Sequence, residues 1–418
     1  MVGDPKYRIF QPRVVQPGPS NEGEPVSLSV SKRVQRVKPS PTMAVTALAA
    51  ELRAAGRDII GLGSGEPDFD TPQHIKDAAI AAIIAGQTKY TNVDGTPELK
   101  QAIIDKFERD NDLSYTPTQI LVSSGGKQSC FNACMAVLDD GDECIIPAPY
   151  WVSYPDMALL AGAEPVPVLA GIDQGFKITP AQLEAAITER SRLLFFNSPS
   201  NPTGAAYTRT ELEALGEVLR KHPRIVIATD DMYEHIYWAD EPFTSFAQVC
   251  PDLYDRTITL NGVSKAYAMT GWRIGYCGGP EEIIKAMKKV QSQSTSNPCS
   301  VSQAASIAAL NGDQTCVANM LKAFHERHDY LVAALNDIPG FTCSEGAGTF
   351  YAFPNIEGAM NATGCQEDSD FSELLMKKAD VALVPGSAFG APGYLRLSFA
   401  TSMEILEKAI GRINGMLG

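Results

Sequence analysis

Residues 261–276 read NGVSKAYAMTGWRIGY, directly after the β-branched run TITL. That run is typical of a buried strand, which would present Lys265 where the chain turns, and Arg273 follows between two glycines. A strand-end lysine can form a Schiff base with an aldehyde when its amine is partly neutral. An arginine fork can hold a phosphate. The pair suggests pyridoxal phosphate, although most lysines at such a spacing are solvated surface charges.

The composition narrows the class of protein. The chain has 418 residues, enough for two domains, and its net charge of -14 argues against nucleic acid as a partner because no basic stripe is present. No apolar run approaches the ~20 residues that span a membrane. Nine cysteines lack CxxC pairs or complementing histidines, so we expect reduced thiols in a cytoplasmic protein and no metal site.

From Gln119 onward, short apolar strands alternate with helical segments, as in QILVSS, ECIIPAPYW, SRLLFFN, RIVIAT and TITL. This pattern predicts an α/β fold with a mostly parallel sheet covered by helices on both faces. Residues 1–25 are expected to be a flexible extension without the apolar core of a signal peptide. The expected domains are the N-terminal part of a small domain at 26–72, a large cofactor-binding domain at 73–300, and a long helix with the C-terminal part of the small α+β domain at 301–418.

Several helices carry local signals. Thr96 followed by Pro97 is a start signal, with an N-cap hydroxyl and a proline at the first helical position. Further helices are expected at about 41–55, 73–85, 209–221 and 314–336.

The segment SSGGKQ lies between a predicted strand and a predicted helix. Gly125 and Gly126 would expose backbone N–H groups at the helix N-terminus, where a phosphate can bind, or they serve only the turn. Lys127 opposes the helix dipole there. A nearby anion would offset that cost, and so would simple solvation.

Polar and aromatic side chains end three more strands, at the edge where open α/β sheets bind ligands. Asp230 can pair with a protonated pyridine nitrogen, and Tyr233 with a ring hydroxyl. Trp151 can stack on a flat ring, and Asn201 ends the neighbouring strand. A loop-capping aspartate and a core tryptophan are the common alternatives.

The chain contains, in this order, SGEPDFDTP, SGGKQ, PYWVSYP, NPTG, DDMYEH, SKAYAMTGWRIG and LRLSFAT. The combination resembles the pyridoxal-phosphate aminotransferases of fold type I, and most of all the prokaryotic-type aspartate aminotransferases, some of which also use prephenate. The resemblance covers the chain from about residue 30 to its C-terminus. It implies a large domain with a mostly parallel sheet and a smaller α+β domain built from both chain ends.

The resemblance also implies roles toward the cofactor. Lys265 would form the Schiff base and act as the acid–base catalyst of a 1,3-proton shift. Asp230 would pair with the pyridine nitrogen, while Tyr233 and Asn201 would contact the ring hydroxyl. The remaining cofactor contacts would come from Gly125, Gly126, Lys127, Trp151 and Arg273, with Tyr90 reaching the phosphate of the neighbouring subunit.

Substrate contacts follow from the same resemblance. Arg396 would pair with the α-carboxylate, which the Gly65 backbone N–H also contacts. No arginine precedes the Ser-Asn-Pro turn in KKVQSQSTSNP, so Lys127 and Thr42 would hold the distal carboxylate. Lys38 matches a basic position associated with prephenate use. Trp151 and Asn201 would complete the substrate site.

The implied activity is that of an aspartate aminotransferase, moving an amino group between L-aspartate and 2-oxoglutarate in a cytoplasmic homodimer with shared active sites. Alternatives are a bifunctional aspartate/prephenate aminotransferase, an aminotransferase for alanine or aromatic amino acids, and a lyase on the same cofactor. A ligand-sensing regulatory domain is a further alternative. Its usual DNA-binding module would not fit into 25 leading residues, and Lys127 is the feature that favours dicarboxylates.

Overall fold

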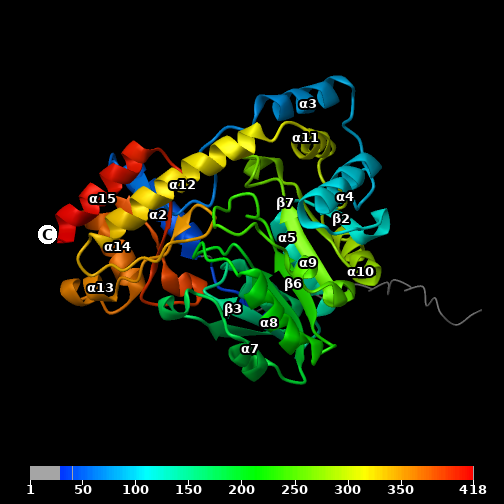
Figure 1. The fold of residues 1–418 in the computed structure, drawn as a ribbon. Helices are drawn as coiled ribbons and strands as arrows, with labels where there is room; N and C mark the ends of the chain where they lie inside the picture. The colour runs from blue at the N-terminus through cyan, green and yellow to red at the C-terminus, as the bar shows by residue number, and fades with distance from the viewer. Residues whose placement is uncertain (1–28, 40, 418) are drawn as a thin grey trace, which may run out of the picture.

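A seven-stranded sheet forms the centre of the computed structural model, which describes residues 29–39 and 41–417 (Figure 1). The strand order is β2-β8-β7-β6-β5-β3-β4, and β8 is the strand that runs antiparallel to its neighbours β2 and β7. The expected extension at 1–25 lies outside the described residues. The strands are β2 (Ile120–Ser123), β3 (Glu143–Ala148), β4 (Glu164–Leu169), β5 (Ser191–Asn197), β6 (Val226–Asp230), β7 (Thr257–Gly262) and β8 (Gly275–Gly278).

Both faces of this sheet are covered by helices. Alternate residues of one strand point to opposite faces, so an apolar strand places apolar side chains on both. On β5, Leu193 and Phe195 belong to one apolar cluster, whereas Leu194 and Phe196 belong to another. The first cluster is covered by α5 (Gly126–Val137), α6 (Ser153–Ala161) and α10 (Glu281–Ser292). The other face is covered by α4 (Pro97–Asn111), α7 (Pro180–Ala186), α8 (Arg209–Arg220), α9 (Phe246–Val249) and α11 (Ser300–Asn311). The predicted α/β class is therefore confirmed.

The start of α4 follows from its first residues. The Thr96 hydroxyl accepts a hydrogen bond from the Leu99 backbone N–H at 3.3 Å, and Pro97 occupies the first helical position. Leu99, Ile103 and Phe107 then bury one face of the helix against β2 and β8. This packing fixes the polar C-terminal turn of α4 behind the sheet edge that carries the candidate site.

The two chain ends form a second, smaller unit, in which Figure 1 shows the blue α2 beside the red and orange C-terminal elements. β1 (Ile60–Gly61) pairs in parallel with β10 (Val381–Ala382), and β12 (Leu395–Ser398) lies between β11 (Val384–Pro385) and β9 (Tyr351–Ala352). The domain borders expected from the sequence stay a prediction. The remaining helices are α1 (Lys32–Gln35), α2 (Pro41–Ala54), α3 (Gln73–Ile84), α12 (Thr315–Asn336), α13 (Glu357–Thr363), α14 (Asp368–Lys378) and α15 (Met403–Leu417). Within the described ranges no helix has the length and apolar character to cross a membrane.

Candidate active site

A cavity of about 500 Å³ opens at the carboxyl ends of β5, β6 and β7. Parallel strands end together at this edge, which is where open α/β sheets place their ligand sites. The structure brings ten of the predicted site residues together in the cavity wall: Gly65, Gly126, Lys127, Trp151, Asn201, Asp230, Tyr233, Lys265, Arg273 and Arg396.

Four predicted residues do not line this cavity or cannot be assigned to it. Gly125 lies directly behind the wall, against Arg273. Lys38 is exposed, and its backbone hydrogen-bonds the carboxylate of Asp156 on α6. Tyr90 is 93% exposed in this chain. The side chain of Thr42 lies outside the described atoms, although its neighbour Met43 lines the cavity.

Lys265 follows β7 and projects into the cavity, where its Nζ donates a hydrogen bond to the Gly65 carbonyl. Burial, assisted by the positive charge of Arg396, lowers the pKa of Lys265 to about 8. A buried amine of this kind is partly neutral near neutral pH, which is the state that attacks a carbonyl.

Asp230 is the last residue of β6, and its carboxylate is held from two directions. Oδ2 accepts a hydrogen bond from the Tyr154 hydroxyl at 2.6 Å, and Oδ1 accepts one from the Met232 backbone N–H at 3.3 Å. Burial raises the pKa of Asp230, and both hydrogen bonds oppose that shift. A cation in the cavity would favour the ionised carboxylate further. Tyr154 was missed in the sequence, where its signal is a position three residues after Trp151, in the first turn of α6.

The N-terminus of α5 and Arg273 form a cradle for an anion. Gly125 has φ +91°, and a side chain there would clash with the Arg273 guanidinium. Gly275 on β8 approaches so closely that a side chain would clash with the backbone of Gly125 and Gly126. Exposed N–H groups, the helix dipole and one guanidinium therefore converge on the cavity, as a phosphate site requires.

Arg396 on β12 is 3% exposed and has an unsatisfied donor. Its Nη1 donates to Asn201 Oδ1 at 2.9 Å and its Nη2 to the Gly63 carbonyl at 2.7 Å, but Nε has no partner among the described atoms. The guanidinium lies 4.4 Å from the Tyr351 ring centroid. A buried, partly unpaired guanidinium next to a cavity is suited to bind a carboxylate.

The hydroxyl groups of Tyr233 and Tyr351 lie 3.1 Å apart in the cavity wall. Tyr351 is a second residue that the sequence did not identify, since it begins a two-residue strand with a weak signal. Lys127 stands at the mouth with its Nζ 5.0 Å from the Trp151 ring centroid. Burial and the neighbouring Arg273 lower the pKa of Lys127.

These residues fit pyridoxal phosphate. The glycine cradle with Arg273 would hold its phosphate, Asp230 its ring nitrogen, Tyr233 its ring hydroxyl and Lys265 its aldehyde carbon. The fit rests on the clash that any side chain at Gly275 would cause with the backbone of the cradle, and on the buried carboxylate of Asp230 in the same cavity wall.

Residues 57–413 match the family described as aminotransferase class I and II, and the chain belongs to this family. It is therefore a pyridoxal-phosphate-dependent aminotransferase, so the predicted family, enzyme class and cofactor are confirmed.

Known aminotransferases are similar to this chain over most of its length. One is the aspartate/prephenate aminotransferase of Nitrosomonas europaea, 59% identical over 396 residues that cover 93% of this chain and 100% of that relative. A crystal structure of the aspartate aminotransferase from Rhizobium meliloti shares 48% identity with a TM-score of 0.89, covering 93% of this chain and 98% of that one. The Thermus thermophilus aspartate aminotransferase with maleate shares 43% identity with a TM-score of 0.87, covering 93% and 100%. These neighbours confirm the fold type that the sequence motifs predicted.

Proposed function

We propose that this aminotransferase transfers the amino group between L-aspartate and 2-oxoglutarate, giving oxaloacetate and L-glutamate. The observation that carries the proposal is the pair of cations that remains in the cavity wall once Lys265 and Arg273 are assigned to the cofactor. These are the buried Arg396 and, at the mouth, Lys127. One cation suffices for the α-carboxylate that all amino acids share. The second cation would bind the distal carboxylate of a dicarboxylic substrate, and maleate, the molecule named with the Thermus thermophilus relative, is a dicarboxylate.

Each side chain then has a task that follows from its position. Pyridoxal phosphate, when bound, supplies a carbonyl for the amino group and a ring that accepts electrons. With the cofactor bound, the Lys265 Nζ, whose pKa is lowered, would accept the proton of the substrate α-carbon. The Asp230 carboxylate would favour a positive charge on the ring nitrogen, and Arg396 would orient the substrate through its α-carboxylate.

Replacing Lys127 by alanine tests the substrate assignment. A hydrogen bond to a charged group contributes about 1.5–3 kcal/mol, so kcat/KM for aspartate and glutamate should fall roughly ten- to a hundredfold. Alanine has no distal carboxylate and serves as the matched control substrate, with a much smaller expected loss. Equal losses for alanine and aspartate would mean that Lys127 serves the cofactor or the helix terminus instead.

Prephenate use is a second candidate, favoured by the name of the Nitrosomonas europaea relative and by the place of Lys38. Lys38 and Lys127 both act electrostatically on Asp156, so two lysines gather beside the cavity mouth. A substrate with a second carboxylate beyond a ring could reach this pair. Assay of the same protein with prephenate and either glutamate or aspartate decides between one activity and two.

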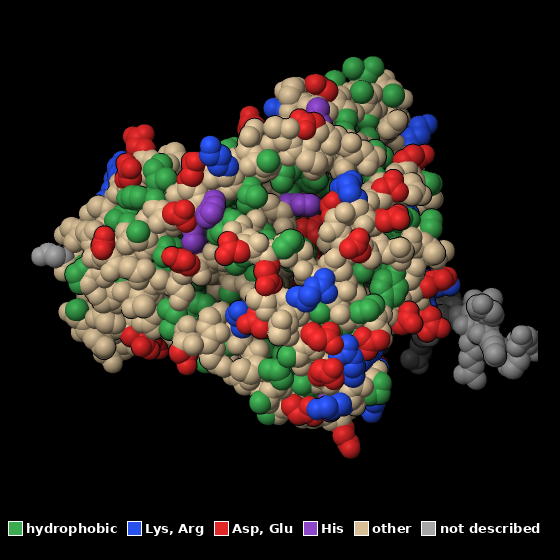
Figure 2. Space-filling model, viewed as in Figure 1, with side chains coloured by type: hydrophobic (Ala, Val, Ile, Leu, Met, Phe, Trp, Pro, Cys, Tyr) green, Lys and Arg blue, Asp and Glu red, His purple; other side chains and the backbone are tan. Residues whose placement is uncertain are grey.

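A homodimer with shared active sites is part of the proposal. Tyr90 is almost fully exposed, and α3 presents Ile80, Ile83 and Ile84 to solvent, where hydrophobic side chains gather in Figure 2. A contiguous exposed apolar face usually marks a contact with another chain. A second copy seated there would remove these side chains from water and bring Tyr90 to a neighbouring phosphate site. The cytoplasmic location stays a prediction.

A further inference from the structure

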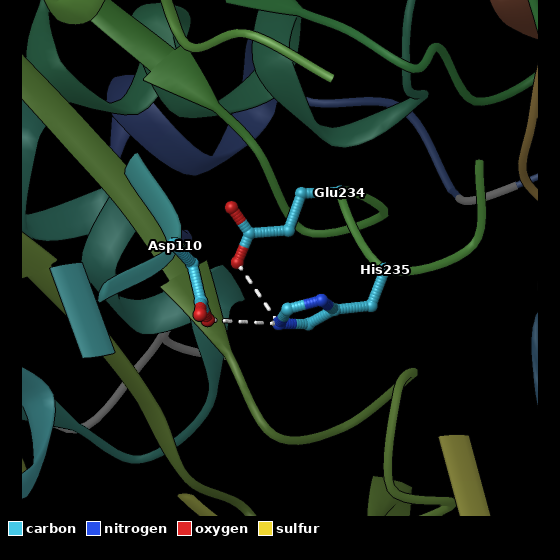
Figure 3. Close-up of side chains that lie close together, drawn as sticks. All are labelled: Asp110, Glu234 and His235. Carbon is cyan, nitrogen blue, oxygen red and sulfur yellow. Dashed lines mark ion pairs between the residues drawn. The ribbon is translucent and has the colours of Figure 1, made fainter. Parts of the chain in front are cut away.

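A cluster of three potential metal ligands lies behind the active site, formed by Asp110, Glu234 and His235 (Figure 3). His235 Nε2 lies 3.3 Å from Glu234 Oε1 and 3.6 Å from Asp110 Oδ2. However, the Lys106 ammonium contacts the Glu234 carboxylate and lies 3.8 Å from Asp110 Oδ2. A fully buried lysine already supplies positive charge at this position, so the cluster needs another explanation than a metal ion.

Glu234 is the centre of the cluster, and both of its carboxylate oxygens are used. Oε1 accepts a hydrogen bond from Asn261 Nδ2 at 2.8 Å, and Oε2 accepts one from Asn111 Nδ2 at 2.8 Å. Lys106 Nζ also donates to Asn111 Oδ1 at 2.7 Å. Burial opposes ionisation, yet Lys106 and His235 lower the pKa of Glu234 to about 2, so the carboxylate is charged throughout the physiological range. All four side chains that make these bonds are buried.

The partners of Glu234 belong to the segments that carry the chemistry. Glu234 itself follows Tyr233 in the loop after β6, the strand that ends at Asp230. Asn261 lies at the end of β7, and its Oδ1 accepts a hydrogen bond from the Gly262 backbone N–H at 2.7 Å, three residues before Lys265. The Glu234 carboxylate therefore joins the two catalytic loops side chain to side chain.

The third attachment is the C-terminal part of α4, which contributes Lys106 and Asn111. This helix is anchored independently through its apolar face against β2 and β8. A buried network of this kind, in which each of the four side chains has a hydrogen-bond partner, restricts them to one arrangement. Active-site groups need such support from residues that do not touch the substrate.

We propose that Glu234 is a positioning residue, whose carboxylate fixes the loop of Asp230 and Tyr233 relative to the loop of Lys265 by holding Asn261 against α4. The proposal rests on the roles given above to Lys265 and Asp230. It assigns Glu234 no contact with substrate or cofactor.

Asn261→Ala is the sharpest test, because it removes the link to the lysine loop and leaves the Glu234–Lys106 pair intact. Asn132→Ala is the matched control, since Asn132 is equally buried, donates one hydrogen bond of 2.9 Å to Gln291, and touches neither loop. Four quantities are measured: the melting temperature without cofactor, the pH midpoint of the absorbance change of the bound cofactor, and kcat and KM for aspartate.

We expect both variants to lose stability to a similar degree. Asn261→Ala should also lower kcat about tenfold or more with little change in KM, and shift the absorbance midpoint by about half a pH unit or more. Asn132→Ala should keep kcat within about twofold and the midpoint unchanged. Equal kcat and midpoint values in the two variants would overturn the proposal, because a merely structural role would affect stability alone.

Should Asn261→Ala fail to fold, the double variant Glu234→Gln with Lys106→Met removes both charges of this buried ion pair together, so that neither is left without the other. Loss of kcat with a retained melting temperature supports the proposal, and an unchanged kcat overturns it. The absorbance midpoint distinguishes a failure of the proposed function from a failure of the proposed role of Glu234. If the wild-type protein did not accept aspartate, the proposed function would fail, whereas the midpoint would still report whether Glu234 positions Lys265.

Discussion

The surroundings of Lys265 disfavour the protonated, positively charged form of its amine. Its pKa of about 8 lies below the ordinary lysine value of 10.5, because the amine is buried beside Arg396. Between these two pH values the unfolded chain binds more protons than the native chain. The native state without cofactor is therefore penalised below about pH 8, and the penalty disappears as the pH rises toward 10.5.

Lys265→Met should accordingly stabilise the cofactor-free protein at pH 7, by up to about 3 kcal/mol, because it removes this penalty. The gain should shrink between pH 8 and pH 10 as the wild-type amine loses its proton. Thermal melting of both proteins across this range, after removal of pyridoxal phosphate, measures the difference. A gain that stays constant with pH would show that packing of the methionine, and not the buried charge, is responsible.

Among the elements, β8 and α5 meet at glycines beside the anion cradle, and Cys277 of β8 belongs to the same apolar cluster as Cys130 of α5. The backbone of Gly275 lies so close to Gly125 and Gly126 that no side chain fits between them. This contact sets the distance between the N–H groups of the α5 N-terminus and Arg273, which precedes β8.

Gly275→Ala is therefore expected to push β8 away from α5. The affinity for pyridoxal phosphate should fall at least about tenfold. The free energy of unfolding should fall by about 1–3 kcal/mol, because the added methyl group overpacks the contact. Gly279→Ala is the control at the other end of the strand, where an added Cβ would meet Ile258 at an ordinary 3.4 Å. Cofactor titration followed by fluorescence, together with melting curves, compares the two. Similar affinities would contradict a role of this contact in the phosphate site.

Among these elements, the sequence predicts the helix starts that local capping residues determine and the side chains that lie together because they follow the ends of parallel strands. The start of α4 at Thr96 and Pro97 is set by capping chemistry, and Asp230 and Lys265 lie together because parallel strands end at one edge. The antiparallel position of β8 between β2 and β7 has no local signal. The same holds for the bond of Tyr154 to Asp230 across 76 residues and that of Asn111 to Glu234 across 123. Such contacts depend on packing that a single sequence does not display.

At the scale of the whole molecule, residues of the proposed site divide into two groups. Lys265 and Arg396 line the same cavity of one chain, although they come from the large sheet and from the small unit. Tyr90 is exposed to solvent, as are the isoleucines Ile80, Ile83 and Ile84 of α3. In the proposed dimer this tyrosine would complete the site of the partner, so the two groups would be supplied by different chains.

Mixing Lys265→Ala protein with Tyr90→Ala protein should therefore restore activity once subunits exchange, assayed at a cofactor concentration that does not saturate the Tyr90 variant. One site of each heterodimer then combines a native Lys265 with a native Tyr90, and about a quarter of the wild-type activity is expected at full exchange. Lys265→Ala mixed with Arg396→Ala is the matched control. Both residues belong to the cavity of one chain, so no heterodimer site is native and no activity should return. Exchange shown by differently tagged subunits, without recovery in the first mixture, would mean that Tyr90 does not act across a subunit boundary.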